Sequence, residues 1–226
     1  MTLQIGGSGL RLYPEYFDRK AQGAVLAALR GVLAVAPFFT PRMPKSGRPM
    51  SVGMSNCGPL GWVSDERGYR YEPAHPQTCT PWPAIPDILI ALWSDVAQYP
   101  HPPEACLINY YGAAAKMGLH QDRDETDFSA PVVSLSLGDS CLFRIGGLRR
   151  NDPTRSLRLN SGDVLVLGGD ARLAFHGVDR IYSNTSTLLA EGGRINLTIR
   201  RVSHAPNALA GARGASQTGV SGSANW

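Results

Sequence analysis

The chain has 226 residues, of which 43% are hydrophobic and 18% charged, so its composition is that of a globular domain and not of a disordered segment. Its formal net charge of +4 is carried almost entirely by arginine, which suits bidentate binding of phosphate or carboxylate but does not alone establish nucleic-acid binding. Because no membrane-spanning apolar run, signal-peptide pattern or CxxC pair occurs, we expect a cytoplasmic protein with no membrane association, zinc knuckle or disulfide framework.

The first half of the chain predicts two helices separated by an irregular segment. Apolar side chains recur at helical spacing over residues 16–35, until Pro37 ends the pattern. Residues 37–86 are rich in proline, glycine and aromatic residues, which predicts an irregular segment that partly forms hairpins. A second helix is predicted over residues 86–99. Its apolar face consists of Ile88, Leu89, Leu92 and Val96.

The second half of the chain predicts short strands separated by turns. The strands cover residues 105–110, 132–137, 141–145, 163–167, 173–176 and 194–202. Glycine-rich turns between short strands favour an antiparallel sandwich or jelly roll over βαβ units, so we expect an α+β, mainly β fold with helices covering one sheet. Residues 203–226 are mainly alanine, glycine, serine and asparagine, which predicts a flexible tail.

The segment His120-Gln121-Asp122 is a candidate metal site. In an extended segment, side chains at i and i+2 point to the same side, so His120 and Asp122 can bind one ion while Gln121 faces away. His176 is predicted at the end of a strand, where a barrel mouth would place it beside this pair. Two imidazoles and one carboxylate hold Fe(II) on one face and leave coordination positions open. The alternative is a core histidine and an aspartate that begins a turn.

The last predicted strand alternates strictly between polar and apolar side chains. Arg194, Asn196, Thr198 and Arg200 share one face, which either contacts solvent or lines a polar cavity. Six residues of strand span ~20 Å, so in a cavity the two arginines suit opposite ends of an elongated dianion.

A five-carbon diacid such as 2-oxoglutarate meets that requirement. One carboxylate and the adjacent ketone can chelate iron while the distal carboxylate meets a guanidinium. Asn109 and Tyr111 share one face of another strand and can add an amide and a hydroxyl as neutral donors. Ordinary strand packing is the other interpretation of these two residues.

At this point several segments, taken in order, resemble the bacterial AlkB family of DNA-dealkylating dioxygenases. They are Asn109-Tyr110-Tyr111, His120-Gln121-Asp122-Arg123-Asp124-Glu125, Gly146-Gly147-Leu148-Arg149-Arg150-Asn151-Asp152-Pro153, His176-Gly177 and Arg194-Ile195-Asn196-Leu197-Thr198-Ile199-Arg200. The similarity extends upstream through residues 56–62 and 81–83. It therefore covers nearly the whole chain except its first residues and its tail.

This resemblance implies a double-stranded β-helix (jelly-roll) enzyme. It implies one catalytic domain over residues 1–202, with a substrate-recognition lid at 37–86 and a jelly-roll core at 105–202. By the same resemblance, the Fe(II) ligands and catalytic residues are His120, Asp122 and His176. The residues that bind 2-oxoglutarate are Asn109, Tyr111, Arg194, Asn196 and Arg200, and O2 is the second co-substrate.

The resemblance also implies the reaction, which is oxidative demethylation of bases such as N1-methyladenine and N3-methylcytosine with release of formaldehyde, succinate and CO2. The implied substrate residues are Trp62, Tyr69, Asp124 and Arg150. The expected partner is alkylated single- or double-stranded DNA, with RNA as a further partner, and no protein partner is expected.

Two departures from the family pattern concern packing. Leu167 stands where the best-known bacterial member has a tryptophan, so the packing beside the metal or co-substrate is expected to differ. The connection over residues 177–193 is one residue longer than in that member. Neither departure involves a proposed ligand.

Two other functions fit parts of the pattern. One is a 2-oxoglutarate-dependent hydroxylase or demethylase that acts on RNA, protein or a small molecule. The other is a nucleic-acid binding module without activity. Formaldehyde release from methylated single-stranded DNA distinguishes the repair function from both.

Overall fold

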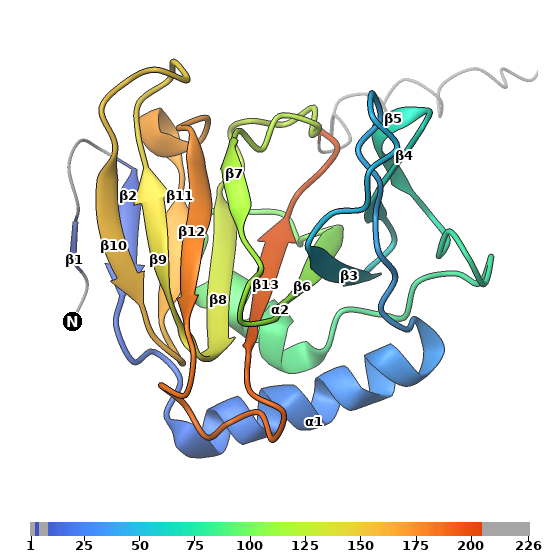
Figure 1. Ribbon diagram of the computed structural model, residues 1–226, viewed down its shortest axis with the longest axis horizontal. Helices are drawn as coiled ribbons and strands as arrows, with labels where there is room; N and C mark the ends of the chain where they lie inside the picture. The colour runs from blue at the N-terminus through green and yellow to red at the C-terminus, as the bar shows by residue number, and fades with distance from the viewer. Residues whose placement is uncertain (1–2, 5–8, 205–226) are drawn as a thin grey trace, which may run out of the picture.

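The computed structural model describes residues 3–4 and 9–204 (Figure 1). The flexible tail predicted over residues 203–226 lies outside the described residues beyond position 204. Neither helix in the described part of the chain is long and apolar enough to cross a membrane.

Two antiparallel sheets form the body of the molecule. The larger one, the major sheet, has seven strands in the order β1-β2-β11-β8-β13-β6-β3. Their bounds are Leu3–Gln4 (β1), Leu10–Tyr13 (β2), Val164–Leu167 (β11), Val132–Gly138 (β8), Arg194–Arg200 (β13), Ala105–Tyr111 (β6) and Val52–Cys57 (β3). The minor sheet has four strands in the order β10-β9-β12-β7. Their bounds are Arg155–Leu159 (β10), Ser140–Ile145 (β9), His176–Tyr182 (β12) and Met117–His120 (β7).

The segment that was predicted to form hairpins contains one beyond β3. Strands β4 (Gly61–Asp65) and β5 (Gly68–Glu72) pair with each other in a separate two-stranded sheet. Figure 1 shows this hairpin at one end of the molecule, above β3 and away from β9 and β10. The described residues also include a short 3-10 helix at Gly169–Ala171.

Two helices cover the outer face of the major sheet. Helix α1 spans Arg19–Val35, and the carboxylate of Asp18 caps its first turn by accepting from Ala21 N at 2.7 Å. Helix α2 spans Asp87–Val96 and follows Pro86, which fits the preference of proline for helix starts. Both buried faces contact the major sheet in one hydrophobic cluster, so the prediction that helices cover one sheet is confirmed.

A second hydrophobic cluster lies on the inner side of the major sheet, towards the minor sheet. Strand β13 shows how the major sheet separates the two clusters. Its side chains Ile195, Leu197 and Ile199 belong to the cluster under the helices. Its alternate side chains, including Asn196 and Thr198, therefore face the space between the sheets. The polar row of this strand is buried and does not contact bulk solvent.

The structure corrects several predicted boundaries. Helix α1 begins at Arg19 and not at residue 16, and α2 ends at Val96 and not at residue 99. The strand predicted at residues 173–176 is wrong, because β12 begins only at His176, Leu173 lies in a turn, and Ala174 and Phe175 have no regular secondary structure. Strands β1, β2, β3, β7 and β10 were not predicted, and neither was β12 beyond His176. Each is short or follows an irregular segment, so its alternating pattern is too brief to detect.

Candidate active site

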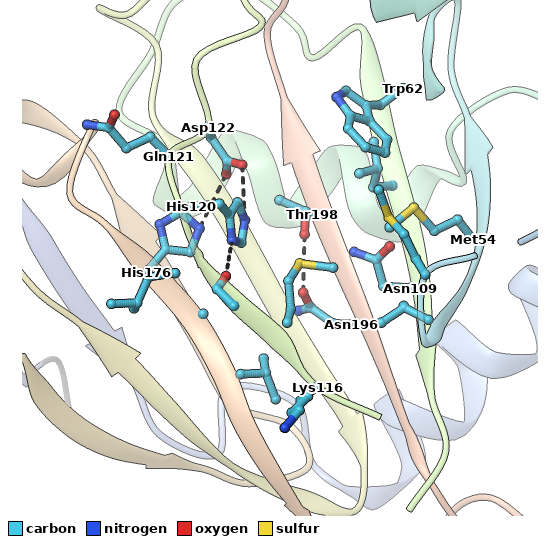
Figure 2. Close-up of a pocket in the computed structure, with 18 of the residues that line it drawn as sticks. Met54, Trp62, Asn109, Lys116, His120, Gln121, Asp122, His176, Asn196 and Thr198 are labelled. Atoms are coloured by element: carbon cyan, nitrogen blue, oxygen red, sulfur yellow. Dashed lines mark hydrogen bonds and ion pairs between the residues drawn. The ribbon is translucent and has the colours of Figure 1, made fainter. Parts of the chain in front are cut away.

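A cavity of about 940 Å³ opens between the two sheets and beneath the β4–β5 hairpin. The major sheet contributes Asn109, Tyr111, Asn196, Thr198 and Arg200 to its lining, and β7 and β12 contribute His120 and His176. Trp62 and Tyr69 from the hairpin complete the lining on another side. Figure 2 shows His120, Asp122 and His176 grouped on one side of this cavity, across from Trp62 and Asn109.

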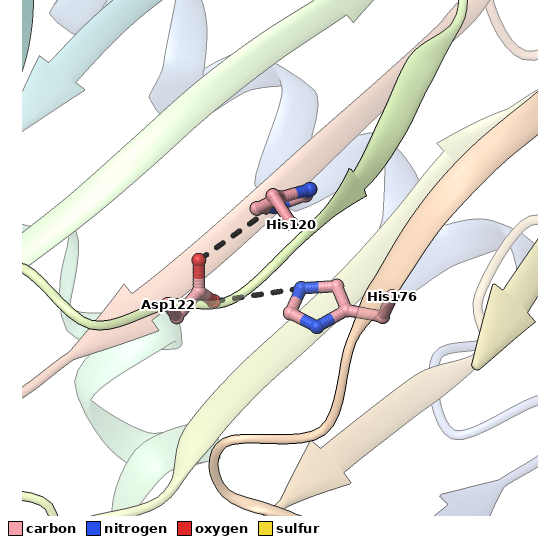
Figure 3. Close-up of side chains that lie close together, drawn as sticks. All are labelled: His120, Asp122 and His176. Carbon is pink, nitrogen blue, oxygen red and sulfur yellow. Dashed lines mark ion pairs between the residues drawn. The ribbon is translucent and has the colours of Figure 1, made fainter. Parts of the chain in front are cut away.

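The structure brings His120, Asp122 and His176 together in one cluster (Figure 3). One ligand atom from each lies within 4.8 Å of the other two. His120 Nε2 is 3.7 Å from Asp122 Oδ1, and His176 Nε2 is 3.7 Å from Asp122 Oδ2. Strand pairing explains this proximity, because His176 at the start of β12 is directly opposite His120 at the end of β7. Asp122 lies just beyond β7.

Gly177 allows β12 to approach β7 closely enough for this cluster to form. A Cβ atom at this position would lie 2.5 Å from the carbonyl oxygen of Met117, so any larger residue would push the strands apart. The residue after His176 is therefore a glycine because β12 and β7 approach each other too closely for a side chain there.

Backbone carbonyls fix the orientation of both imidazoles. His120 Nδ1 is 3.0 Å from the carbonyl oxygen of Gly118, and His176 Nδ1 is 2.9 Å from that of Ala174. A carbonyl can only accept, so each Nδ1 carries the proton and each Nε2 presents its lone pair to the cluster. Both rings are therefore oriented as metal ligands.

Burial and charge keep the cluster in the protonation state that metal binding needs. Burial is the main cause that lowers the pKa of His176 to about 4, so its imidazole is neutral near pH 7. Burial alone would raise the pKa of Asp122, but the charge of the neighbouring Arg200 guanidinium holds it well below its usual range. The cluster thus offers a neutral imidazole at His176 and a carboxylate at Asp122.

Arg200 and Arg194 occupy different surroundings on β13. Arg200 Nη2 lies 2.8 Å from Asp122 Oδ1, so this guanidinium stands beside the metal cluster. Arg194 is 1% exposed, and its Nη2 donates to Ser136 Oγ at 2.9 Å. Its guanidinium carbon is 5.3 Å from the ring centroid of Tyr111, which lines the cavity although Arg194 itself does not.

Several buried polar atoms in this region lack a hydrogen-bond partner. Among the described side chains they are Asn109 Oδ1, Asp122 Oδ2, Arg194 Nε, Arg194 Nη1 and Arg200 Nε. A buried polar group without a partner is costly, and all of these atoms belong to residues predicted to hold iron or 2-oxoglutarate. The donor and acceptor set therefore fits a divalent cation beside a molecule with two carboxylates. The individual ligand roles remain a prediction.

The predicted substrate residues lie on the rim of the same cavity. Trp62 stacks on Tyr69 with ring centroids 5.4 Å apart, and its Nε1 donates to Asp124 Oδ2 at 2.8 Å. Tyr69 is 45% exposed, so the outer side of this aromatic pair is accessible. Arg150 Nη1 donates to the carbonyl of Leu119 at 2.7 Å, and its guanidinium carbon is 4.9 Å from the ring centroid of Phe175.

Two buried residues, Glu125 and Arg172, and the half-buried Tyr71 lie next to the cluster and were not predicted as functional. Glu125 accepts from Tyr71 at 2.5 Å and lies 3.2 Å from both Arg200 and Arg172. Arg172 also donates to the carbonyl of Asp122 at 2.7 Å. The adjacency of Glu125 to Asp124 in the sequence was a signal for the first of these residues. Arg172 and Tyr71 are far from the motif in the sequence, so no sequence signal indicated their role.

Leu167, which departs from the family pattern, lines the cavity and is 2% exposed. It adds an aliphatic wall beside the polar groups. The predicted difference in packing therefore concerns a residue in contact with the site.

Comparison with known proteins gives a consistent result. The pattern of the 2OG-Fe(II) oxygenase superfamily matches residues 9–200. The alpha-ketoglutarate-dependent dioxygenase AlkB homolog of Caulobacter vibrioides is 54% identical over 193 residues, which cover 85% of this chain and 87% of that protein. The AlkB of Escherichia coli K12 is 43% identical over 189 residues, covering 82% of this chain and 87% of that protein.

A solved structure shows the same architecture. The structure of OsALKBH1 superposes with a TM-score of 0.77 at 31% identity and covers 88% of this chain and 99% of that chain. The predicted jelly-roll fold is therefore confirmed. Given the length of these matches and the His-Asp-His cluster, the chain belongs to the AlkB family of Fe(II)- and 2-oxoglutarate-dependent dioxygenases.

Proposed function

We propose that this enzyme demethylates N-alkylated bases in DNA, such as N1-methyladenine and N3-methylcytosine, and so repairs alkylation damage. The observation that carries this proposal is the position of Trp62 and Asp124 on the cavity that holds the His-Asp-His cluster. An aromatic face and a carboxylate acceptor are the groups that bind a flipped-out base. The cluster lies in the same cavity, where it can reach an alkyl group on that base.

When bound, iron and 2-oxoglutarate would supply the oxidising chemistry, in which O2 is consumed, succinate and CO2 are formed and the methyl group leaves as formaldehyde. The protein holds and orients the reactants. His120, Asp122 and His176 would hold the iron. Arg200 with Asn196 would bind the carboxylate of 2-oxoglutarate near the metal, and Arg194 with Tyr111 the distal one, while Asn109 adds an amide.

We propose that the base enters between the lid and the sheets. Trp62 offers a ring face for stacking, and Asp124 accepts from the exocyclic amine of adenine or cytosine. Tyr69 supports the ring of Trp62 from behind, and Arg150 contacts a phosphate at the cavity mouth. Methylation at N1 of adenine or N3 of cytosine disrupts base pairing, which makes extrusion of the damaged base easier.

The proposed base contacts do not involve the sugar, so we include methylated RNA among the substrates. We further propose that residues 1–202 act as one catalytic unit, with 37–86 as its lid and 105–202 as its core, and that no protein partner is required. The four cysteines are free, as expected for a protein that acts in the reducing cytoplasm.

The test is incubation of the purified protein with Fe(II), 2-oxoglutarate, ascorbate and an oligonucleotide that contains N1-methyladenine. Mass spectrometry should show loss of one methyl group, with equimolar succinate and formaldehyde. The variant Asp122→Ala should be inactive under the same conditions. Succinate formation that does not depend on the oligonucleotide, with the methyl group retained, would contradict the proposal.

A further inference from the structure

The outer face of the minor sheet carries a concentration of arginine side chains. Between Ser140 and Leu159 the chain contains five arginines and a single acidic residue, Asp152. All five are exposed, and Arg144 and Arg158 lie on strands of the minor sheet together with the exposed Arg180 of β12. We call these three residues the arginine face.

Strand alternation explains why these side chains point outwards. Phe143 of β9 and Val178 of β12 belong to the core between the sheets, as does the partly buried Leu157 of β10. Arg144 and Arg158 are sequence neighbours of Phe143 and Leu157, so they project from the opposite side of the sheet. A bulge between Val178 and Arg180 gives Arg180 the same outward direction.

The register of the strands sets the spacing of the arginine face. Arg158 and Arg180 are both paired with Leu142, one from each neighbouring strand. Their Cα atoms are therefore two strand spacings apart, or ~10 Å, and Arg144 lies two residues further along β9, or ~7 Å. The three cations form a triangle on one side of the sheet.

The arginine face carries three cations, and Asp179, next to Arg180 in the β12 bulge, is an exposed acidic neighbour. Within the described residues, none of the three arginines forms an ion pair, whereas Arg70 and Arg200 each pair with acidic side chains. Arg144 Nε donates to Thr154 Oγ1 at 3.1 Å, and the guanidinium carbon of Arg158 is 5.0 Å from the ring centroid of Tyr182. These contacts orient the guanidinium groups and leave their charge available to an anion.

The arginine face continues into the mouth of the cavity. Arg144 is paired with Gly177, the neighbour of His176, and β9 leads directly into the loop that carries Arg149 and Arg150. Arg150 lines the cavity. Figure 1 shows the β9–β10 loop projecting beyond the sheet, next to the turn that precedes β12. A strip of positive charge thus runs from the cavity mouth over this loop to the outer side of the sheet.

We propose that the arginine face binds the phosphate backbone of the nucleic-acid strand beyond the base held in the cavity. Guanidinium groups suit phosphate, and single strands carry one negative charge per nucleotide along their length. This inference rests on the proposed function, because it assigns a path to the substrate of that reaction. It predicts that the enzyme prefers long strands over short ones.

The experiment compares two single-stranded oligonucleotides with one N1-methyladenine each, a pentanucleotide and a 20-mer. Fluorescence anisotropy gives the affinity over a range of salt concentrations, and formaldehyde release gives turnover. The test variant is Arg144→Gln/Arg158→Gln/Arg180→Gln. The control variant, Arg19→Gln/Lys20→Gln/Arg30→Gln, removes the same charge from exposed positions on α1.

For the 20-mer, the test variant should bind on the order of tenfold more weakly near 0.1 M salt, and its log–log salt dependence should be shallower by roughly 2, from about 0.7 per lost phosphate contact. Turnover of the pentanucleotide should be unchanged, which also shows that the variant is folded. The control variant should behave like the parent with both oligonucleotides.

Two results would overturn the proposal. One is equal affinity of the parent for both oligonucleotides, and the other is the same loss of affinity in the test and control variants. Absence of demethylation by the parent enzyme would instead contradict the proposed function, since the binding measurement does not depend on turnover.

Discussion

The hydroxyl of Tyr71 accepts a hydrogen bond from Arg200 Nη1 at 2.9 Å and donates one to Glu125 at 2.5 Å. Tyr71 belongs to β5 of the β4–β5 hairpin, whereas Arg200 ends β13 of the major sheet and also contacts Asp122. One half-buried phenol therefore joins the proposed lid to the proposed binding sites for co-substrate and metal. The position of the lid and the position of Arg200 are linked through this contact.

Replacing Tyr71 by phenylalanine should weaken 2-oxoglutarate binding. The substitution removes the hydroxyl that accepts from Arg200 and donates to Glu125. Because both of these side chains are buried, we expect 2-oxoglutarate binding and the free energy of unfolding each to fall by about 1–3 kcal/mol. The KM for 2-oxoglutarate, measured by succinate formation, should rise about tenfold or more, since 1.4 kcal/mol is a factor of ten.

Tyr69→Phe is the matched control for this substitution. Among the described residues its hydroxyl contacts Met43 Sδ alone, at 3.9 Å, so the variant should keep the KM of the parent for 2-oxoglutarate. If both variants have that unchanged KM, the link between lid and co-substrate does not contribute to binding.

Replacing Arg194 by glutamine should abolish the preference for a dicarboxylate. The unpartnered Nε and Nη1 atoms of Arg194 are the proposed donors to the distal carboxylate. We expect the KM for 2-oxoglutarate to rise on the order of a hundredfold, as charge-assisted hydrogen bonds are lost. Steady-state kinetics with 2-oxopentanoate, which has the same five carbons and no distal carboxylate, provides the comparison. A variant that still strongly prefers 2-oxoglutarate would exclude this role for Arg194.

Replacing Asp122 by alanine should eliminate iron binding. The carboxylate lies within 3.7 Å of both imidazoles, and no other acidic group belongs to the cluster in the described part of the chain. The iron content of desalted protein, measured by plasma mass spectrometry, should fall to background together with turnover. Asp124→Ala serves as the control because it should retain iron. Iron bound stoichiometrically to Asp122→Ala would show that the metal site lies elsewhere.

Asp124→Ala itself should affect the nucleic acid and not the co-substrate. It removes the acceptor for Trp62 Nε1 and the proposed acceptor for the base amine. The KM for a methylated oligonucleotide should rise about tenfold, the value expected from the loss of one or two hydrogen bonds. The KM for 2-oxoglutarate should stay constant. The reverse pattern would place Asp124 on the co-substrate side of the cavity.

The metal-free protein should lose stability as the pH falls below about 6.5. His176 has a pKa of about 4 in the folded chain and ~6.5 when unfolded, so between these values the unfolded chain binds more protons. The free energy of unfolding should therefore decrease with falling pH in this range, by at most on the order of 3 kcal/mol. Asp122, whose pKa is lowered on folding, adds a loss of the same sign at more acidic pH.

Urea unfolding of chelator-treated protein from pH 7 to pH 4 provides the measurement. His176→Gln lacks the titrating imidazole, so its unfolding free energy should depend less steeply on pH. Equal slopes in parent and variant would show that the imidazole of His176 titrates normally in the folded chain.

Much of the site was predictable because, in two short segments, the polar side chains recur at every second residue, as expected for one face of a strand. The alternation of β13 predicted a polar row, and the structure shows that this row is buried and faces the other sheet. The i, i+2 spacing of His120 and Asp122 predicted that both could reach one ion, although Asp122 lies beyond the strand. Local periodicity sufficed for these features because each depends on neighbouring residues.

The remaining features depend on pairing between distant segments. His176 was predicted to end a strand, yet it begins β12, because the apolar residues Leu173 to Phe175 precede the strand instead of forming it. The burial of Arg172 and Tyr71 beside Glu125 requires three segments that are far apart in sequence to meet. A single sequence contains no periodic signal for such contacts.

The carbonyl groups of Gly118 and Ala174 fix the protonated nitrogen of each imidazole. They thereby also limit how well the protein can discriminate between metal ions. A rigid set of two nitrogens and one carboxylate suits cobalt and nickel as well as iron, and affinity for such a set generally increases from iron to nickel. Since these three ligands alone do not favour iron, the supply of ions in the cell contributes to its selection. Protein purified on nickel resin would fold normally and remain inert until the wrong ion is removed.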